Sequence, residues 1–358
     1  MENGLESLQR DMRRVLREFI PVLQSWMTGE GTRTIDPFET EYSENYAPAN
    51  AAVILAGVYR HTGESKHREL FLSMIRRSVE LLQKRSEVNP FCRVFLFHYS
   101  LMALLMLPEP DRASVRAEFA AFYSGYVDDC LIVNTNCAAL QWGMEIFLEA
   151  LNFRGADGSK LEKLLDHVER AQLESGFIND EVSEREANDG MPIAYHAFTL
   201  FILTGVVATA GGLSPALAKM RPRVDAILAK GMRWLMHAAA PDGTFAMTER
   251  SSYQMFTWGA WVALLSATSL RDTPLFRQAW EYWLKYRHSD GSYSCTPNFL
   301  AHELRAGFEL YTHVNMYNNL GFTGIVVADR LIEDSLNGGH RILGLQLPED
   351  GVFADPES

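Results

Sequence analysis

Cysteine is scarce in this sequence. The chain has 358 residues and four widely spaced cysteines, and no two of them form a CxxC pair. Structural zinc sites need clustered thiolates or imidazoles, and disulfide frameworks need several closely spaced cysteines. The sequence therefore predicts no disulfide framework and no zinc site, and we expect no metal ion or other cofactor. The four residues are Cys92, Cys130, Cys137 and Cys295.

Targeting patterns and long apolar runs are also lacking. The first residues, MENGLESLQR, do not show the charged-then-apolar order of a secretory signal. No apolar run approaches the length of a membrane span. We therefore expect a cytoplasmic protein without membrane contact, or a periplasmic or secreted one if a signal has been removed.

Basic residues are fewer than acidic residues in this sequence. Lysine and arginine total 33 against 45 aspartates and glutamates, so the formal net charge is -12. Nucleic acids and anionic membranes are bound by clustered lysine and arginine, so this balance argues against such partners. An anionic substrate is still compatible, because a local basic pocket can exist in an acidic protein. A hydrophobic share of 47% with 22% charged residues is ordinary for a globular enzyme.

Strand-type alternation of valine, isoleucine and threonine is scarce, and helical periodicity dominates. About twelve helices are predicted, in two kinds that alternate along the chain. The amphipathic segments are Leu5–Met27, Ser65–Arg85, Asp111–Gly125, Ser159–Leu173, Pro215–Ala239 and Pro274–Tyr286. The segments that are apolar on most sides are Ala47–Tyr59, Phe91–Leu107, Asn136–Leu151, Pro192–Ala210, Tyr253–Ser269 and Glu309–Ile332.

The alternation predicts the architecture. An amphipathic helix covers a core, whereas a helix that is apolar on every side is surrounded by protein. We therefore predict an all-α (α/α)6-type toroid, an incomplete barrel of about six helical hairpins with an inner and an outer ring. A single toroid domain is expected over residues 1–335, followed by a C-terminal tail over 336–358. A plain helical solenoid is the alternative, although its helices usually carry a clearer repeated motif.

The loops that lead into the inner helices share a glycine turn followed by an aromatic residue. The pattern occurs in Ser175–Phe177, Asp242–Phe245 and Asp290–Tyr293, and a long polar connector follows each time. In a toroid all outer-to-inner connectors emerge at one end. Long loops at one end of a scaffold are where a binding cleft is expected.

The predicted starts of the inner helices are rich in polar side chains. Helix capping explains single asparagines and serines there, but it does not explain the recurrence of tyrosine, histidine and arginine. The residues are Asn45, Tyr46, Asn50, Arg93, Asn134, Asn136, Tyr195, His196, Arg250, Ser252, Tyr253, His313, Asn315, Tyr317, Asn318 and Asn319.

Several of these segments resemble a known family. Asn136-Cys-Ala-Ala-Leu-Gln-Trp-Gly-Met-Glu-Ile resembles the Asn-His motif and apolar helix of toroidal polysaccharide lyases, the all-helical alginate lyases and the heparinase II/III-like lyases. Asp189-Gly-Met-Pro-Ile-Ala-Tyr-His-Ala-Phe resembles a later segment of these enzymes, in which a Tyr-His pair opens an inner helix. The stretch from Pro241 to Tyr253 is similar to uncharacterised toroid proteins related to them. Cys137 stands where those lyases often have histidine.

The resemblance implies a lyase that cleaves an acidic, uronic-acid-containing polysaccharide by β-elimination. Such an enzyme removes the C5 proton of the uronate and expels the 4-linked sugar, while neutral amides or an arginine stabilise the charged carboxylate. By resemblance, Asn136 would neutralise the carboxylate and Tyr195 would be the catalytic acid and a candidate base. Because Cys137 replaces the histidine, His196 and His313 are the further candidates for the base.

Other residues at the helix starts are candidates for substrate binding. Arg250 either binds a uronate carboxylate bidentately or forms a surface ion pair with Glu249. Tyr253 and Tyr317 either stack on sugar rings or pack in the core. The segment after His313 has the densest group of polar side chains, and we favour a role in the cleft for it. The predicted substrate contacts are Tyr46, Asn134, Arg250, Tyr253, Asn315 and Tyr317.

A glycoside hydrolase on the same toroid is the rival enzyme, because its chemistry uses two carboxylates. The connector before Tyr195 is rich in carboxylates, although a charge-rich connector is usually just solvated. A non-catalytic glycan- or protein-binding role is the third alternative, since the fold by itself does not decide among these functions. The carboxylates of the connector are Asp180, Glu181, Glu184, Glu186 and Asp189.

Overall fold

A computed structural model describes most of the chain. The described residues are 4–29, 31–37, 44–85, 88–127, 130–132, 134–181, 193–240, 243–244, 254–289, 291–295 and 313–338. Twelve α-helices and one two-stranded antiparallel hairpin occur in these ranges. The prediction of an all-α chain is confirmed.

The helices alternate between an outer and an inner set. The outer helices are α1 (Gly4–Ser25), α3 (Ser65–Gln83), α5 (Asp111–Gly125), α7 (Gly158–Ala171), α9 (Pro215–Ala238) and α11 (Pro274–Trp283). The inner helices are α2 (Ala47–Thr62), α4 (Pro90–Met106), α6 (Thr135–Ala150), α8 (Ile193–Ala210), α10 (Met255–Ser266) and α12 (Val314–Leu336). The hairpin pairs β1 (Met27–Thr28) with β2 (Arg33–Thr34), and the 3-10 turns η1 (Ser269–Asp272) and η2 (Leu284–Tyr286) flank α11.

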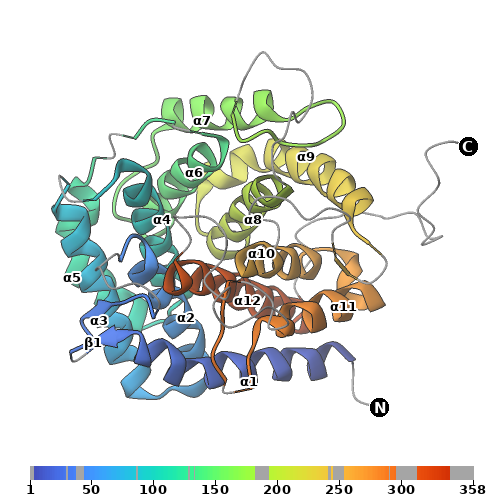
Figure 1. Cartoon of the computed structure of the whole chain (residues 1–358). Helices are drawn as coiled ribbons and strands as arrows, with labels where there is room; N and C mark the ends of the chain where they lie inside the picture. The colour runs from blue at the N-terminus through green and yellow to red at the C-terminus, as the bar shows by residue number, and fades with distance from the viewer. Residues whose placement is uncertain are drawn as a thin grey trace, which may run out of the picture.

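The inner helices form a ring (Figure 1). Each packs against the next one along the chain, and α12 packs against α2. The ring formed by the described helices is therefore closed rather than left as an incomplete barrel. Each outer helix covers a neighbouring inner one, for example α3 on α2 and α7 on α6, with α1 on α12. A solenoid would leave its first and last helices apart, so the toroid prediction is confirmed and the solenoid is excluded.

Burial follows the two sequence patterns. On the outer helix α7, Leu161, Leu164, Leu165 and Val168 are buried on one face. On the inner helix α8, fifteen of eighteen residues are buried, because protein surrounds the helix on all sides. By length and composition α8 could cross a membrane, contrary to our expectation of no such run, but 83% of it is buried inside the protein. It is the kind of helix that forms the core of a toroid.

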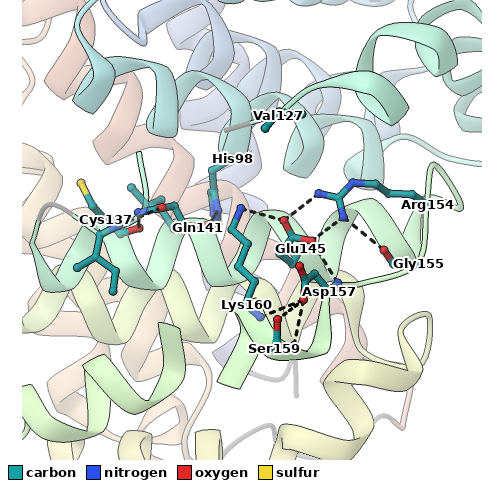
Figure 2. Close-up of polar contacts among 12 residues, drawn as sticks. His98, Val127, Cys137, Gln141, Glu145, Arg154, Gly155, Asp157, Ser159 and Lys160 are labelled. Atoms are coloured by element: carbon teal, nitrogen blue, oxygen red, sulfur yellow. Dashed lines mark hydrogen bonds and ion pairs between the residues drawn. The ribbon is translucent and has the colours of Figure 1, made fainter. Parts of the chain in front are cut away.

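A buried carboxylate fixes the α6–α7 hairpin (Figure 2). Glu145 on α6 is 1% exposed in its side chain, and its two oxygens accept hydrogen bonds from Arg154 at 2.7 and 2.8 Å and from Lys160 at 3.1 Å. Burial alone would raise the pKa of Glu145, but the two cations hold it below its ordinary value. The nearby Asp157 caps α7 by accepting from the backbone N–H of Ser159 and of Lys160.

The two ends of the described chain meet at the ring closure. Asp329 on α12 is 3% exposed, and its carboxylate binds Arg13 of α1 at 2.7 Å and His61 of α2. Arg13 also binds Glu333 at 3.0 Å. These contacts join α12 to α1 and α2, the first two helices of the chain. The expected C-terminal tail stays a prediction, because residues 339–358 lie outside the described residues.

Helices α10 and α12 approach one another more closely than side chains allow. A Cβ atom added at Gly259 would lie 2.3 Å from the carbonyl oxygen of Gly321, and one added at Gly324 would lie 2.4 Å from the backbone of Gly259. Glycine is needed at this crossing because backbone contacts backbone, and no flexible side chain can move aside.

We predict that Gly259→Ala destabilises the protein by about 1–3 kcal/mol or more, because the added methyl group forces α10 and α12 apart. Urea unfolding followed by circular dichroism measures the effect. Gly125→Ala, at the exposed end of α5 where no atom lies within 4 Å of the added Cβ, is the matched control and should be neutral. Equal stability of the two variants would contradict the tight crossing.

Candidate functional site

A cavity of about 600 Å³ lies where the inner helices begin. Its lining comes from residues just before or within the first two turns of all six described inner helices and from the connector between α7 and α8. The prediction that the helix starts gather at one end and form a cleft is confirmed for these residues. The lining consists of Asn45, Tyr46, Asn89, Phe91, Cys92, Phe95, Asn134, Asn136, Asp180, Glu181, Tyr195, Phe198, Phe256, His313, Met316, Tyr317 and Leu320.

Asp180 is held in the cavity wall by the start of α6. The side-chain amide of Asn134 donates to one carboxylate oxygen at 3.0 Å, and that of Asn136 donates to the other at 2.9 Å. The backbone N–H of Thr135 donates to the Asp180 carbonyl at 2.6 Å. Asn134 is also the N-cap of α6, since its amide oxygen accepts from the N–H of Cys137 at 3.0 Å. Each carboxylate oxygen of Asp180 thus accepts a hydrogen bond from one asparagine, and the two bonds fix the orientation of the carboxylate.

Asn136 is predicted to neutralise a substrate carboxylate, and in the structure it has a carboxylate partner within the chain. Its amide nitrogen already binds a carboxylate, that of Asp180. Asn136 is 4% exposed, and its amide oxygen is buried without a hydrogen-bond partner. An unpaired buried acceptor costs about 1–3 kcal/mol, which a hydroxyl donor of a ligand would recover. The residue can therefore orient Asp180 and accept a hydrogen bond from a ligand.

Three tyrosines lie around the cavity. Tyr46, just before α2, is 3% exposed, stacks on Phe95 with ring centroids 4.4 Å apart and hydrogen-bonds with Tyr317. Burial raises the pKa of Tyr46 well above its ordinary value, and the nearby Cys92, Tyr99 and Tyr195 add to the rise. Its phenol therefore stays protonated to a higher pH than an ordinary tyrosine. Tyr195 is half-buried on the first turn of α8 and also lines the cavity.

An arc of aromatic rings forms the apolar part of the wall. Phe91 lies 4.7 Å from Phe95, Phe95 lies 5.8 Å from Phe198, and Phe198 lies 5.7 Å from Phe256. Phe256 continues the arc to Tyr317 at 5.1 Å. The sequence reasoning missed these phenylalanines, because a phenylalanine on an apolar helix is usually core. Their position in the first turns of inner helices was the signal that could have found them.

His196 does not reach the cavity, although it follows Tyr195 directly. Consecutive helical residues point about 100° apart, so the two side chains diverge. His196 is fully buried toward α9, where its Nδ1 accepts from the N–H of Ile178 at 3.0 Å and its Nε2 donates to the carbonyl of Gly231 at 3.1 Å. Burial lowers the pKa of His196 to about 3. Both nitrogens are occupied, so the candidacy of His196 as the base is wrong.

The remaining predicted site residues differ in where they lie. His313 is the N-cap of α12 and lines the cavity. Asn315 is fully buried, its N–H donates to Asp36 at 3.0 Å, and it does not line the cavity. The assignment of Asn315 to substrate binding is therefore not supported. Arg250 and Tyr253 lie outside the described residues, so their roles stay predictions.

The described lining of the cavity is acidic. It holds the carboxylates of Asp180 and Glu181 and the imidazole of His313, and none of its described residues is a lysine or an arginine. Glu181 is exposed, whereas Asp180 is half-buried. A carboxylate-bearing sugar would thus be repelled by the described lining unless a cation such as Arg250 compensates. Of the five carboxylates considered for hydrolysis, these two lie at the cavity, and the other three lie outside the described residues.

Sequence comparison alone does not assign the chain to a family. No family model matches it, and no curated protein matches its sequence.

Comparison of structures is more informative. A polysaccharide lyase has a TM-score of 0.56 and 11% identity, covering 92% of this chain and 98% of its own. An α-1,6-mannanase of glycoside hydrolase family 76 from Salegentibacter sp. has a TM-score of 0.57 and 12% identity, covering 90% and 99%. A cellobiose 2-epimerase from Spirochaeta thermophila has a TM-score of 0.58 and 11% identity, covering 94% and 100%.

These similarities extend over nearly the whole of each chain, so the protein has the α/α-toroid fold of these enzymes. The predicted α/α-toroid fold is therefore confirmed. At such low identity the similarity defines the fold, and the matching enzymes include a lyase, a hydrolase and an epimerase. The comparison therefore does not favour lyase chemistry over hydrolysis or epimerisation.

We predict that His196→Phe lowers stability at neutral pH by about 2–4 kcal/mol, because two buried backbone groups lose their partners. The effect should be pH-dependent. The folded pKa of His196, about 3, lies below its ordinary 6.5, so its stabilisation is complete above pH 6.5 and is lost as the pH falls toward 3. Between pH 7 and pH 5, the free energy of unfolding of the wild type should fall by about 2 kcal/mol more than that of the variant.

Chemical unfolding of both proteins at each pH measures this difference. The structural role also predicts that the folded variant keeps its ligand binding. A variant of unchanged stability that has lost binding or activity would contradict the structural role of His196.

Proposed function

We propose that the protein is a carbohydrate-active enzyme that binds an oligosaccharide or polysaccharide in the cavity and cleaves a glycosidic bond. The observation that carries the proposal is the oriented carboxylate of Asp180, held by Asn134 and Asn136 inside an aromatic cavity. Aromatic rings stack on the apolar faces of sugars, while carboxylates, amides and phenols exchange hydrogen bonds with hydroxyl groups. The α/α-toroid fold, which is that of several sugar-processing enzymes, supports the same proposal.

The chemistry that this lining favours is hydrolysis of a sugar without a carboxylate. Hydrolysis needs one carboxyl group as acid and a second as base or nucleophile. Asp180 and Glu181 are consecutive residues that both line the cavity. In the Salegentibacter mannanase, an inactive variant has two consecutive aspartates replaced by asparagine, and it was obtained in complex with α-1,6-mannotriose. We therefore assign Asp180 and Glu181 as the pair, with Tyr46 as a hydroxyl donor to the substrate.

β-Elimination on a uronate polymer is the second candidate, and Tyr195 favours it. This phenol lines the cavity on α8, where the sequence resembles toroidal lyases, and His313 is the remaining candidate for a separate base. The reaction also needs donors that face the substrate carboxylate. Since Asn136 already binds Asp180, this role would pass to Arg250 or another cation.

The two chemistries give different products. Incubation with neutral gluco- and manno-oligosaccharides and with uronate polymers should produce new reducing ends, and the far-ultraviolet absorbance of an unsaturated uronate reports elimination. For hydrolysis we expect reducing ends without this absorbance, and a loss of at least about 100-fold in kcat for Asp180→Asn and for Glu181→Gln. For elimination we expect the absorbance to appear and Tyr195→Phe to abolish it.

Glu174→Gln is the matched control, because Glu174 is an exposed carboxylate of the same connector that does not line the cavity. It should keep full activity. Binding of every polymer without any product would contradict catalysis and indicate a glycan-binding protein. Full activity of Asp180→Asn with cleavage of neutral sugars would overturn the assignment of Asp180.

A further inference from the structure

Five aromatic rings of the cavity lining form a closed circuit. The ring centroid of Phe95 lies 5.8 Å from that of Phe198, and Phe198 lies 5.7 Å from Phe256. Phe256 lies 5.1 Å from Tyr317, which hydrogen-bonds with Tyr46. Tyr46 stacks on Phe95 at 4.4 Å, so the last ring meets the first. The rings come from the residue before α2 and from α4, α8, α10 and α12.

On the side of α4 and α8 this circuit lies deeper than the helix starts. Phe95 follows the lining residue Phe91 by four residues on α4, and Phe198 follows the lining residue Tyr195 by three residues on α8. At 1.5 Å per residue, the deeper rings are about 4–6 Å further along their helices. The five rings of the circuit are only 2–8% exposed, because they cover one another. They therefore form a floor beneath the cavity.

The interior of the ring of helices is filled beneath this floor. Helix α8 packs against α4 and α12 across the ring, in addition to its ring neighbours α6 and α10. Two turns below Phe198, a Cβ atom added at Gly205 would lie 3.3 Å from the side-chain methyl group of Met102 on α4. Side chains thus meet where a passage along the ring axis would have to run. For the described residues, the cavity is a pocket that is closed at its inner end.

The carboxylate of Asp180 lies in the wall of this pocket. Among the described inner helices, α6 contributes no ring to the floor and instead holds Asp180 through Asn134 and Asn136. The pocket volume of about 600 Å³ is within the range of about 300–1,000 Å³ for pockets that enclose one small ligand. A few sugar units fit into such a space, and a long chain does not pass through it.

We propose that the enzyme acts on chain ends, releasing a short unit of fixed length from an oligosaccharide or polysaccharide. A pocket with a closed floor accepts a sugar chain only by its end, whereas internal cleavage needs a cleft that is open on both sides. The terminal sugar rests its apolar face on the aromatic floor, which brings the adjacent glycosidic bond to Asp180. Each cleavage adds one water across that bond, so one reducing end appears for each unit released. This inference rests on the proposed function.

The products of the full chain test the proposal, with linear gluco- and manno-oligosaccharides of increasing length and the corresponding polymers as substrates. We expect chromatography to show one product size from the earliest time, and reducing ends to accumulate while polymer viscosity stays nearly constant. An early mixture of internal fragments would overturn action on chain ends and leave the proposed function intact. No cleavage and no binding of any substrate would contradict the proposed function, and this inference would fall with it.

Oligosaccharides blocked at one end test entry independently of catalysis. One form carries a bulky fluorophore at its reducing end, and the other carries a bulky group on the terminal hydroxyl of its non-reducing end. Calorimetry with the Asp180→Asn variant should show that one blocked form no longer binds, while the other binds like the unblocked sugar. Binding of both forms with the affinity of the unblocked sugar would overturn the proposal.

A substitution in the floor tests its contact with the terminal sugar. Phe198→Leu should raise KM for the shortest cleaved oligosaccharide about tenfold, with a smaller change in kcat, because the sugar loses contact with an aromatic ring. Phe147→Leu is the matched control, since Phe147 of α6 is fully buried and does not line the pocket. It should keep the KM of the wild type. With both variants folded by circular dichroism, equal changes in KM would overturn the role of the floor.

Discussion

The packing of the six described inner helices against one another is the constraint on which the rest of the structure depends. Each is apolar on nearly all sides, so it is stable only when neighbours surround it, and the ring from α2 to α12 provides these neighbours. A polar group in this interior is stabilised where protein partners satisfy it. His196 and Glu145 illustrate this rule, because every ring nitrogen or carboxylate oxygen of each has a partner.

The starts of the inner helices are where this constraint is relaxed. The first N–H groups of a helix have no partner within it, so capping side chains and connectors gather there. Asn134 shows how capping and site construction coincide, since its oxygen caps α6 while its nitrogen holds Asp180. The ring brings these starts to one end, so that side chains from six inner helices and one connector surround a single cavity. A stable scaffold and a polar site thus arise from the same geometry.

The fold was largely predictable from the sequence, and the site only in part. Helical periodicity identifies both kinds of helix, because one-faced and all-round burial leave different patterns over many residues. The site depends on the direction of single side chains. Tyr195 and His196 are adjacent, yet one lines the cavity and the other lies in the wall toward α9. No local pattern distinguishes Asp180, which is bound by Asn134 and Asn136, from the other carboxylates of its connector.

The sequence by itself determined that this protein is an all-α toroid, because the alternation of amphipathic and wholly apolar helices has few other solutions. It also indicated that the starts of the inner helices would form the site. The tertiary structure alone decided which polar groups pair with each other. Asn136 binds the chain's own Asp180, and Asp329 of α12 binds Arg13 of α1. Both outcomes depend on contacts between residues far apart in the sequence, which hydrophobic periodicity does not encode.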